Sequence, residues 1–148
     1  MKISIIVRSY NGSKYIIQSL ESLKREFFNS AEIVIVDNGS NDNTVDLIKE
    51  FIKNNKSFST KLICQENLGP GGALNTGIEQ SIGEYIGFLD CDDYFMPNMG
   101  KKIINQLNQK NIDIIEFGFL QFSSKKNVEI KNYYSLYRNI SGFYNLEE

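Results

Sequence analysis

The sequence predicts an α/β protein with a doubly wound, mostly parallel sheet of about five strands and helices on both faces. Apolar, β-branched runs alternate about five times with segments whose apolar residues recur at helical spacing. Polar turns rich in asparagine or glycine separate many of these segments. Such alternation is typical of parallel sheets with right-handed crossovers. The expected strands are residues 3–7, 32–37, 61–66, 84–89 and 112–122.

The segments between these strands are expected to be helices. The first begins at Ser13, whose hydroxyl is placed to cap it, and the second has Asn43 or Thr44 as its cap. The third is expected over residues 73–81, after a turn with three glycines, and the fourth over residues 98–109. The apolar face of the first helix consists of Tyr15, Ile16, Leu20, Leu23 and Phe27.

Composition and charge are those of an ordinary globular chain, and they exclude several kinds of site. A chain of 148 residues can bury about two-thirds of the surface that it exposes when unfolded, so it needs no structural metal in order to fold. Sixteen Lys and Arg against eighteen Asp and Glu give a net charge of −2, so nucleic acid is not an expected partner. The sequence has no histidine, so any metal would be held by oxygen. Cys64 and Cys91 are expected to be free, buried thiols.

The chain is expected to comprise an α/β domain over residues 1–122 and an aromatic-rich extension over residues 123–148. The extension holds a short expected strand over residues 128–130 and several tyrosines, which could cover apolar surface or stack on a sugar ring. An exposed apolar patch there could also drive the chain to form a homo-oligomer. The N-terminal apolar run is too short for a signal sequence or a membrane span, which predicts a cytoplasmic chain without a transmembrane segment.

Polar residues follow the expected strands at their carboxyl ends, where open parallel sheets bind ligands. Because these ends meet at one edge of the sheet, the residues form a single candidate site. The set comprises Tyr10 and Asn11 after the first strand, Asp37 and Asn38 after the second, residues 67–75 after the third and residues 90–93 after the fourth.

The acidic run after the fourth strand carries the most information. Carboxylates that converge to 4 Å repel by about 4 kcal/mol per pair at an effective dielectric of 20, so a cation is expected among them. Mg²⁺ or Mn²⁺ suits oxygen ligands and is commonly completed by substrate phosphates. Strand alternation places Asp90 and Asp92 on one face, with Asp93 turned away unless the chain bends, so the ion is assigned to the first pair. The alternative is a solvated acidic turn.

Two other features are less specific. Asp37 could hydrogen-bond a nucleobase or a ribose hydroxyl, or it could serve as a turn residue. The turn over residues 69–72 contains Gly69 and Gly72 and opens onto a helix, so its amides could face an anion. Glycine turns without a ligand are also common.

Four segments stand in a defined order along the chain: SIIVRSYN (4–11), IVIVDNGS (33–40), ENLGPGGALN (66–75) and YIGFLDCDDY (85–94). Together they resemble family 2 glycosyltransferases of the GT-A fold, over about residues 1–105. The resemblance implies an enzyme that transfers a sugar, with inversion, from a nucleotide-sugar donor to a hydroxyl of a glycan or lipid-linked acceptor. A UDP-sugar is the expected donor. The implied setting is surface polysaccharide or glycoconjugate synthesis, with peripheral association at the inner face of the membrane.

The resemblance also implies roles for individual residues. Asp37 reads the base of the nucleotide, and Tyr10 and Asn11 line the same pocket. Asp90 and Asp92 match the family's Asp-x-Asp motif, which contacts the ribose and the divalent ion. With Asp93 they would stabilise the leaving diphosphate. The nucleotide-binding set is Arg8, Tyr10, Asn11, Asp37, Asn67, Gly69, Gly72, Asn75 and Asp90.

The chain departs from the family's pattern at two positions. Arg8 stands where Pro is usual, and Leu74 where a basic residue is usual. Arg8 could restore a positive charge near the phosphates, or it could pair with a surface carboxylate.

No residue matches the family's catalytic base, and neither Asp113 nor Glu116 is assigned to it. The alternative function is therefore a noncatalytic nucleotide-sugar-binding fragment. A receiver-like signalling domain fits less well, because such domains draw their acidic residues chiefly from other strands.

Overall fold

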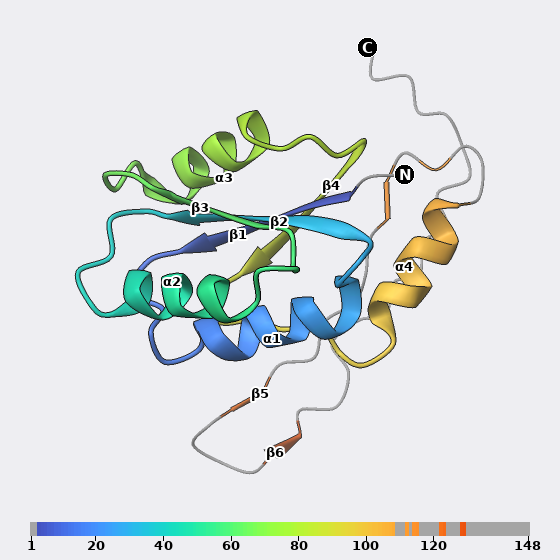
Figure 1. The fold of residues 1–148 in the computed structure, drawn as a ribbon, viewed down its shortest axis with the longest axis horizontal. Coiled ribbons are helices and arrows are strands. Elements are labelled where there is room, and N and C mark those ends of the chain that lie inside the picture. The colour runs from blue at the N-terminus through green and yellow to red at the C-terminus, as the bar shows by residue number, and fades with distance from the viewer. Residues whose placement is uncertain (1–2, 109–111, 113, 116–121, 124–127, 130–148) are drawn as a thin grey trace. The chain divides into compact units, whose positions relative to one another are not determined.

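The computed structural model describes residues 3–108, 112, 114–115, 122–123 and 128–129 (Figure 1). The chain divides into two compact units, Met1–Lys102 and Ile103–Glu148, and the first unit holds the sheet. Among the described residues, no helix has the length and apolar character needed to cross a bilayer. In chain order the elements are β1 (Ile3–Ser9), α1 (Ile16–Phe27), β2 (Ala31–Asp37), α2 (Thr44–Asn54), β3 (Thr60–Cys64), α3 (Gly69–Glu79), β4 (Tyr85–Asp90), α4 (Met99–Leu107), β5 (Phe122–Ser123) and β6 (Val128–Glu129).

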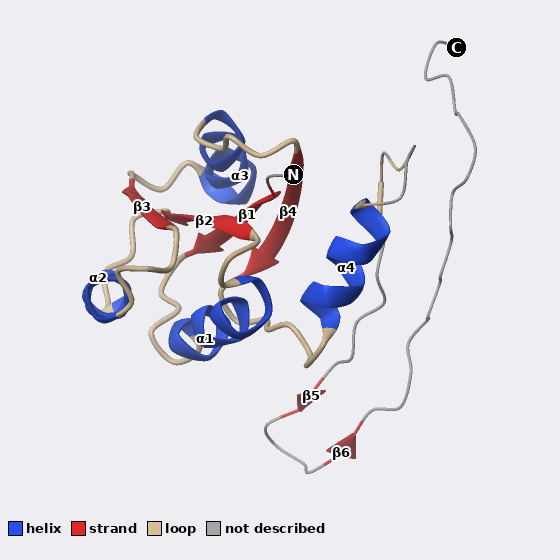
Figure 2. Cartoon of the chain, turned by 45° about the vertical axis from the view of Figure 1, so that its right-hand side comes forward, coloured by secondary structure: helices blue, strands red, loops and turns tan. Residues whose placement is uncertain are grey.

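The sheet of the first unit is parallel, with the strand order β3-β2-β1-β4. Helix α3 covers one face, and α1 and α2 cover the other (Figures 1 and 2). The predicted α/β fold is confirmed, with four strands in this sheet instead of about five. The fifth strand was expected over residues 112–122. Within that range Ile112, Ile114 and Ile115 are not in a strand, Phe122 belongs to β5, and the other residues lie outside the described part.

The core lies around the two central strands. Strands β1 and β2 are buried along most of their length, as their β-branched runs predict for strands covered on both faces. Helix α1 buries Ile16, Leu20, Leu23 and Phe27, as expected, whereas Tyr15 precedes the helix and is 38% exposed. On the other face, a Cβ on Gly77 of α3 would lie 2.4 Å from Cγ2 of Ile6, so a glycine is needed for this close approach.

The outer strands β3 and β4 are less buried than the central strands because, in the described part of this sheet, each pairs with a neighbour on one side only. In β4, Ile86 and Phe88 are exposed, and in β3 the Cys64 side chain is exposed as well. The prediction that both cysteines are buried is therefore wrong for Cys64, while Cys91 is partly buried, and both thiols are free as expected.

The helix starts also differ from the sequence predictions. Helix α1 begins at Ile16, and Ser13 does not cap it; the Ser13 amide instead donates to Asp42 at 3.2 Å. Asn43 is at the N-cap position of α2, but its side chain makes no capping hydrogen bond. The Asp42 carboxylate instead accepts from both the amide and the hydroxyl of Thr44. Helix α3 begins at Gly69 instead of residue 73, with Pro70 in its first turn, where a missing amide hydrogen costs nothing.

Candidate functional site

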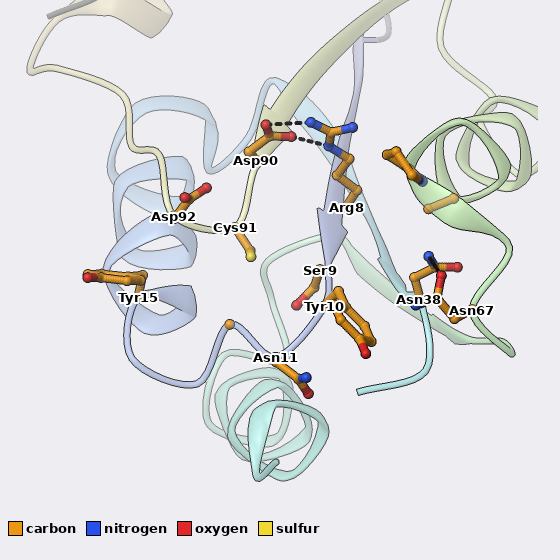
Figure 3. A pocket seen from close by; sticks show the side chains of 13 residues that line it. Arg8, Ser9, Tyr10, Asn11, Tyr15, Asn38, Asn67, Asp90, Cys91 and Asp92 are labelled. Carbon is orange, nitrogen blue, oxygen red and sulfur yellow. Dashed lines mark hydrogen bonds and ion pairs between the residues drawn. The ribbon is translucent and has the colours of Figure 1, made fainter. Parts of the chain in front are cut away.

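A pocket of about 400 Å³ opens at the carboxyl ends of β1 and β4, beside the first turn of α3 (Figure 3). This is the edge of a parallel sheet at which ligands bind. The pocket lies within the first unit of the chain. It is lined by Arg8, Ser9, Tyr10, Asn11, Gly12, Tyr15, Asn38, Asn67, Pro70, Ala73, Asp90, Cys91 and Asp92.

Six residues of the predicted site line this pocket, and five do not. Those in the lining are Arg8, Tyr10, Asn11, Asn67, Asp90 and Asp92. Those outside it are Asp37, Gly69, Gly72, Asn75 and Asp93.

Seven further residues line the pocket. Four of them lie within the ranges pooled at the strand ends, although none was given a role of its own: Asn38, Pro70, Ala73 and Cys91. Ser9, Gly12 and Tyr15 were outside the prediction. Ser9 and Gly12 flank Tyr10 and Asn11, and β1 ends at Ser9, two residues beyond the predicted strand. Tyr15 was predicted on the apolar face of the first helix, but it precedes α1 and lines the pocket.

Hydrogen-bonded polar residues of the loops after β1, β2 and β3 form one side of the pocket and the turn behind it. We call these residues the amide rim, of which the three asparagines line the pocket: Asn11, Asp37, Asn38, Ser40 and Asn67. Asp37 is 2% exposed and accepts from the Ser40 amide at 3.0 Å and from the Ser40 hydroxyl at 2.5 Å. The Ser40 hydroxyl also accepts from the Asn11 amide at 2.8 Å, and the Asn11 side chain accepts from the Asn41 amide at 2.9 Å. The Asp37 carboxylate thus serves the turn after β2 in this structure.

Asn38 joins the loop after β2 to the loop after β3. It is 5% exposed, and its side-chain oxygen accepts from Gln65 Nε2 at 2.8 Å and from the Leu68 amide at 3.0 Å. Its side-chain nitrogen donates to Asn67 Oδ1 at 2.9 Å and to the Gly69 carbonyl at 3.2 Å. All the polar groups of this buried amide are therefore satisfied, and the start of α3 is fixed against β2.

The other side of the pocket is the acidic turn, residues 90–93. The Asp93 amide donates to the Asp90 carbonyl at 3.0 Å, so the chain bends directly after β4. As a result, Asp90, Asp92 and Asp93 each place one carboxylate oxygen within 4.8 Å of the other two. Partial burial and the negative charges of Asp92 and Asp90 raise the pKa of Asp93.

Arg8 contacts this acidic turn directly. Arg8 and Asp90 are opposite each other in the parallel register of β1 and β4, so their side chains leave the same face of the sheet. The guanidinium donates from Nε to Asp90 Oδ1 and from Nη2 to Asp90 Oδ2, the latter at 2.7 Å (Figure 3). This hydrogen bond to Asp90 raises the pKa of Arg8 above its usual value. Arg8 therefore pairs with a carboxylate, and that carboxylate lies in the pocket.

The acidic turn is anchored on both sides. The Cys91 amide donates to the Arg8 carbonyl at 3.2 Å, and a Cβ on Gly12 would lie 2.6 Å from Cys91 Sγ. Burial raises the pKa of the Cys91 thiol. Further along, the Phe95 amide donates to Ser22 Oγ of α1 at 3.0 Å. These contacts hold the carboxylates in place although they repel one another.

The N-terminal part of α3 forms a further wall of the pocket through Pro70 and Ala73. A helix N-terminus carries partial positive charge and favours an anion nearby. The Gly69 amide is already bonded to Asn67 Oδ1 at 2.9 Å. Leu74 packs against the apolar cluster between α3 and the sheet, so its side chain serves the core at the position where a basic residue is usual.

The acidic turn has a donor set that fits a hard divalent cation. Two oxygens bound to one ion with metal–oxygen bonds of about 2.1–2.4 Å lie at most roughly 4.8 Å apart. The three oxygens of Asp90, Asp92 and Asp93 meet this condition. Asp92 and Asp93 could coordinate the cation directly, whereas Asp90 already binds Arg8 through both of its oxygens.

Comparison with known proteins gives one family. Residues 4–146 match the sequence model of "Glycosyl transferase family 2". The chain is 34% identical over 124 residues to the uncharacterized glycosyltransferase EpsJ of Bacillus subtilis, covering 84% of this chain and 36% of EpsJ. It is 30% identical over 143 residues to the glycosyltransferase GlyG of Streptococcus pneumoniae, covering 96% of this chain and 42% of GlyG.

Solved structures agree with this result. The S. aureus TarS 1–349 structure in complex with UDP-GlcNAc superposes with a TM-score of 0.65 at 33% identity, over 73% of this chain and 31% of that one. The mannosyltransferase PcManGT of Pyrobaculum calidifontis, in complex with GDP-Man and Mn²⁺, has the same fold, with a TM-score of 0.68 at 22% identity over 73% of this chain and 32% of that one. The chain spans about a third of the length of the curated relatives it matches.

Proposed function

The chain belongs to glycosyl transferase family 2 and has the GT-A fold, and from this we propose that it binds a nucleoside-diphosphate sugar and transfers the sugar to an acceptor hydroxyl with the help of a divalent cation. The observation that carries the proposal is the position of the acidic turn. Two of its carboxylates line a pocket at the carboxyl end of the sheet, opposite the N-terminus of α3.

The diphosphate of the donor would lie between three positive features. These are the cation held by the acidic turn, the Arg8 guanidinium and the N-terminus of α3, where Pro70 and Ala73 line the pocket. A bound Mg²⁺ or Mn²⁺ would offset the negative charge that develops on the leaving diphosphate. Asp92 and Asp93 would hold this cation, and Asp90 would join them or contact the ribose.

The nucleoside would lie toward the amide rim. Tyr10 is 51% exposed in the pocket wall, and its ring offers a stacking surface for a base. We propose UDP as the nucleotide because TarS, at 33% identity, was solved with UDP-GlcNAc. For Asp37 to read the base, its carboxylate would have to share the bonds that Ser40 now makes to it.

The remaining parts of the reaction are proposed on the family pattern. Inversion at the anomeric carbon requires a base that deprotonates the acceptor, and we assign none. Asp113 and Glu116 lie outside the described residues. We keep residues 1–122 as the donor-binding part and residues 123–148 as the beginning of the acceptor-binding part. A glycan or lipid-linked acceptor at the inner face of the membrane, in polysaccharide or glycoconjugate synthesis, is the setting we propose.

Calorimetric titration with UDP tests the proposal. The 148-residue chain should bind UDP in the presence of Mn²⁺ and much more weakly in EDTA, since the diphosphate would lose its bridge to the acidic turn. Uridine, which has no phosphate, is the matched control and should show no dependence on Mn²⁺. Equal UDP binding with Mn²⁺ and with EDTA would contradict the metal-assisted site.

A second assay separates the enzyme from a noncatalytic binding fragment. Incubation with UDP-GlcNAc and Mn²⁺ should release UDP slowly by transfer to water if the chain is catalytic. Donor binding without any release of UDP would favour the noncatalytic alternative.

A further inference from the structure

Arg8 holds a carboxylate that the proposed cation also requires. Its Nε and Nη2 bond to the two oxygens of Asp90, and the two residues are opposite each other on adjacent strands. A bidentate pair of this kind is among the stronger side-chain contacts, because both hydrogen bonds are charge-assisted. The side chains of Arg8 and Asp90 are 34% and 41% exposed, so water and ligands can reach the pair.

The pair opposes cation binding at the acidic turn in two ways. Both Asp90 oxygens are already engaged, so a cation would have to share or displace the guanidinium. The guanidinium also adds a positive charge beside the oxygens of Asp92 and Asp93, which lie within 4.8 Å of an Asp90 oxygen. Repulsion between the guanidinium and a divalent ion bound at this turn lowers the affinity for that ion.

A diphosphate offers Arg8 a different partner in the same pocket. The planar guanidinium binds phosphate oxygens in the same bidentate manner as a carboxylate. Arg8 lines the pocket together with Pro70 and Ala73, which lie near the N-terminus of α3, where an anion is favoured. A modest rotation of this partly exposed side chain would therefore exchange one anionic partner for another.

We propose that Arg8 couples the two ligands: it holds Asp90 in the absence of donor and transfers to the donor diphosphate when the nucleotide binds, which releases Asp90 to the divalent cation. This inference rests on the proposed function. It makes Arg8 a positioning residue that favours joint binding of nucleotide and cation over binding of the cation alone.

The test is calorimetric titration of Mn²⁺ into the full chain, with and without saturating UDP. In the wild type, UDP should raise the Mn²⁺ affinity by more than about tenfold, and a tenfold change corresponds to roughly 1.4 kcal/mol. Arg8→Gln retains a polar side chain without the charge. It should bind Mn²⁺ about tenfold more tightly than the wild type when UDP is absent, and UDP should then have a smaller effect.

Two further variants separate this role from a general effect of charge. Lys24→Gln removes one positive charge from α1, where Lys24 pairs with Glu21 at 3.8 Å, and should leave the Mn²⁺ affinity unchanged. Asp90→Asn weakens the hold on Arg8 and should raise the affinity for UDP in EDTA several-fold. Circular dichroism of each variant verifies that it is folded.

Unchanged or weaker Mn²⁺ binding by Arg8→Gln in the absence of UDP would overturn the coupling, even if the wild type shows Mn²⁺-dependent UDP binding. Failure of the wild type to bind UDP would instead overturn the proposed function, and the coupling with it.

Discussion

The two sides of the pocket are built on opposite principles. In the amide rim, polar side chains satisfy one another: Asn38 makes four hydrogen bonds, and Asp37 accepts two from Ser40. In the acidic turn, three carboxylates converge and Arg8 contacts one of them. The rim therefore maintains the shape of the pocket, whereas the acidic turn still has carboxylate oxygens that can bind a cation. Residues of the first kind should affect stability, and residues of the second kind should affect ligand binding.

Asn38→Ala should give the largest loss of stability. The substitution leaves several partners of a buried amide without a hydrogen bond, which costs about 2–4 kcal/mol in the free energy of unfolding. Urea denaturation followed by circular dichroism measures it. Asn75→Ala, at an exposed asparagine on α3, is the control and should change the free energy by less than about 0.5 kcal/mol. Similar values for the two variants would show that the rim is not a scaffold.

Ser40→Ala should destabilise the chain by a smaller amount, about 1–2 kcal/mol. It removes the hydroxyl that donates to Asp37 at 2.5 Å and accepts from the Asn11 amide at 2.8 Å, while the backbone bond to Asp37 remains. The same denaturation assay applies, and Ser40→Thr, which retains a hydroxyl, should recover most of the loss. If Ser40→Thr is as unstable as Ser40→Ala, the hydroxyl is not the cause.

Asp92→Asn should affect binding instead of folding. It removes one carboxylate from the acidic turn, so the affinity for UDP in the presence of Mn²⁺ should fall about tenfold, or roughly 1.4 kcal/mol. The free energy of unfolding should stay the same or rise, because repulsion within the turn decreases. Titration calorimetry and urea denaturation measure the two quantities. Asp46→Asn, at an exposed carboxylate on α2, is the control for net charge.

Substitution of Asp42 should have the smallest effect on the free energy of unfolding, and this effect should depend on pH. Its hydrogen bond from the Thr44 hydroxyl lowers the pKa from 3.8 to about 2. A carboxylate with a lowered pKa stabilises the fold above its unfolded pKa, and this contribution is lost as the pH falls from about 3.8 to about 2. The difference in unfolding free energy between the wild type and Asp42→Ala should therefore be constant at neutral pH and shrink over this range. A difference that grows on acidification would contradict a stabilising role for the ionised Asp42 at the start of α2.

Local patterns in the sequence predict most of the fold. The β-branched runs and helical spacings identify β1 to β4 and α1 to α4, because each depends on the periodicity of a short segment. The starts of helices are less well predicted. The Asp42 carboxylate, and not the predicted Asn43 or Thr44 side chain, accepts the amide of the first residue of α2. At the start of α3, Gly69 accepts a hydrogen bond from Asn38 through its carbonyl and donates one to Asn67 through its amide. The bond between Asn38 and Gly69 joins residues that are 31 positions apart in the sequence, whereas the contacts of Asp42 with Thr44 and of Asn67 with Gly69 are local.

The residues that make up the site could be predicted more fully than the contacts between them. Pooling the residues at strand ends identifies Tyr10, Asn67, Asp90 and Asp92, and the resemblance to the family's first motif adds Arg8; all of these residues line the pocket. That Arg8 pairs with Asp90 follows from the strand order β3-β2-β1-β4 and its register, which no local pattern specifies. Likewise, Asp93 joins the acidic turn because the chain bends after β4, whereas strand alternation assumes an extended backbone.

Strand β4 has a further consequence for handling the protein. In this four-stranded sheet it pairs with β1 on one side, and its Ile86 and Phe88 side chains are 39% and 53% exposed. Backbone amides and carbonyls along an outer edge beside apolar side chains form a template for pairing with a strand of another molecule. Fragments that comprise the first unit alone should therefore become turbid as their concentration rises, and lysine in place of Phe88 should keep them dispersed.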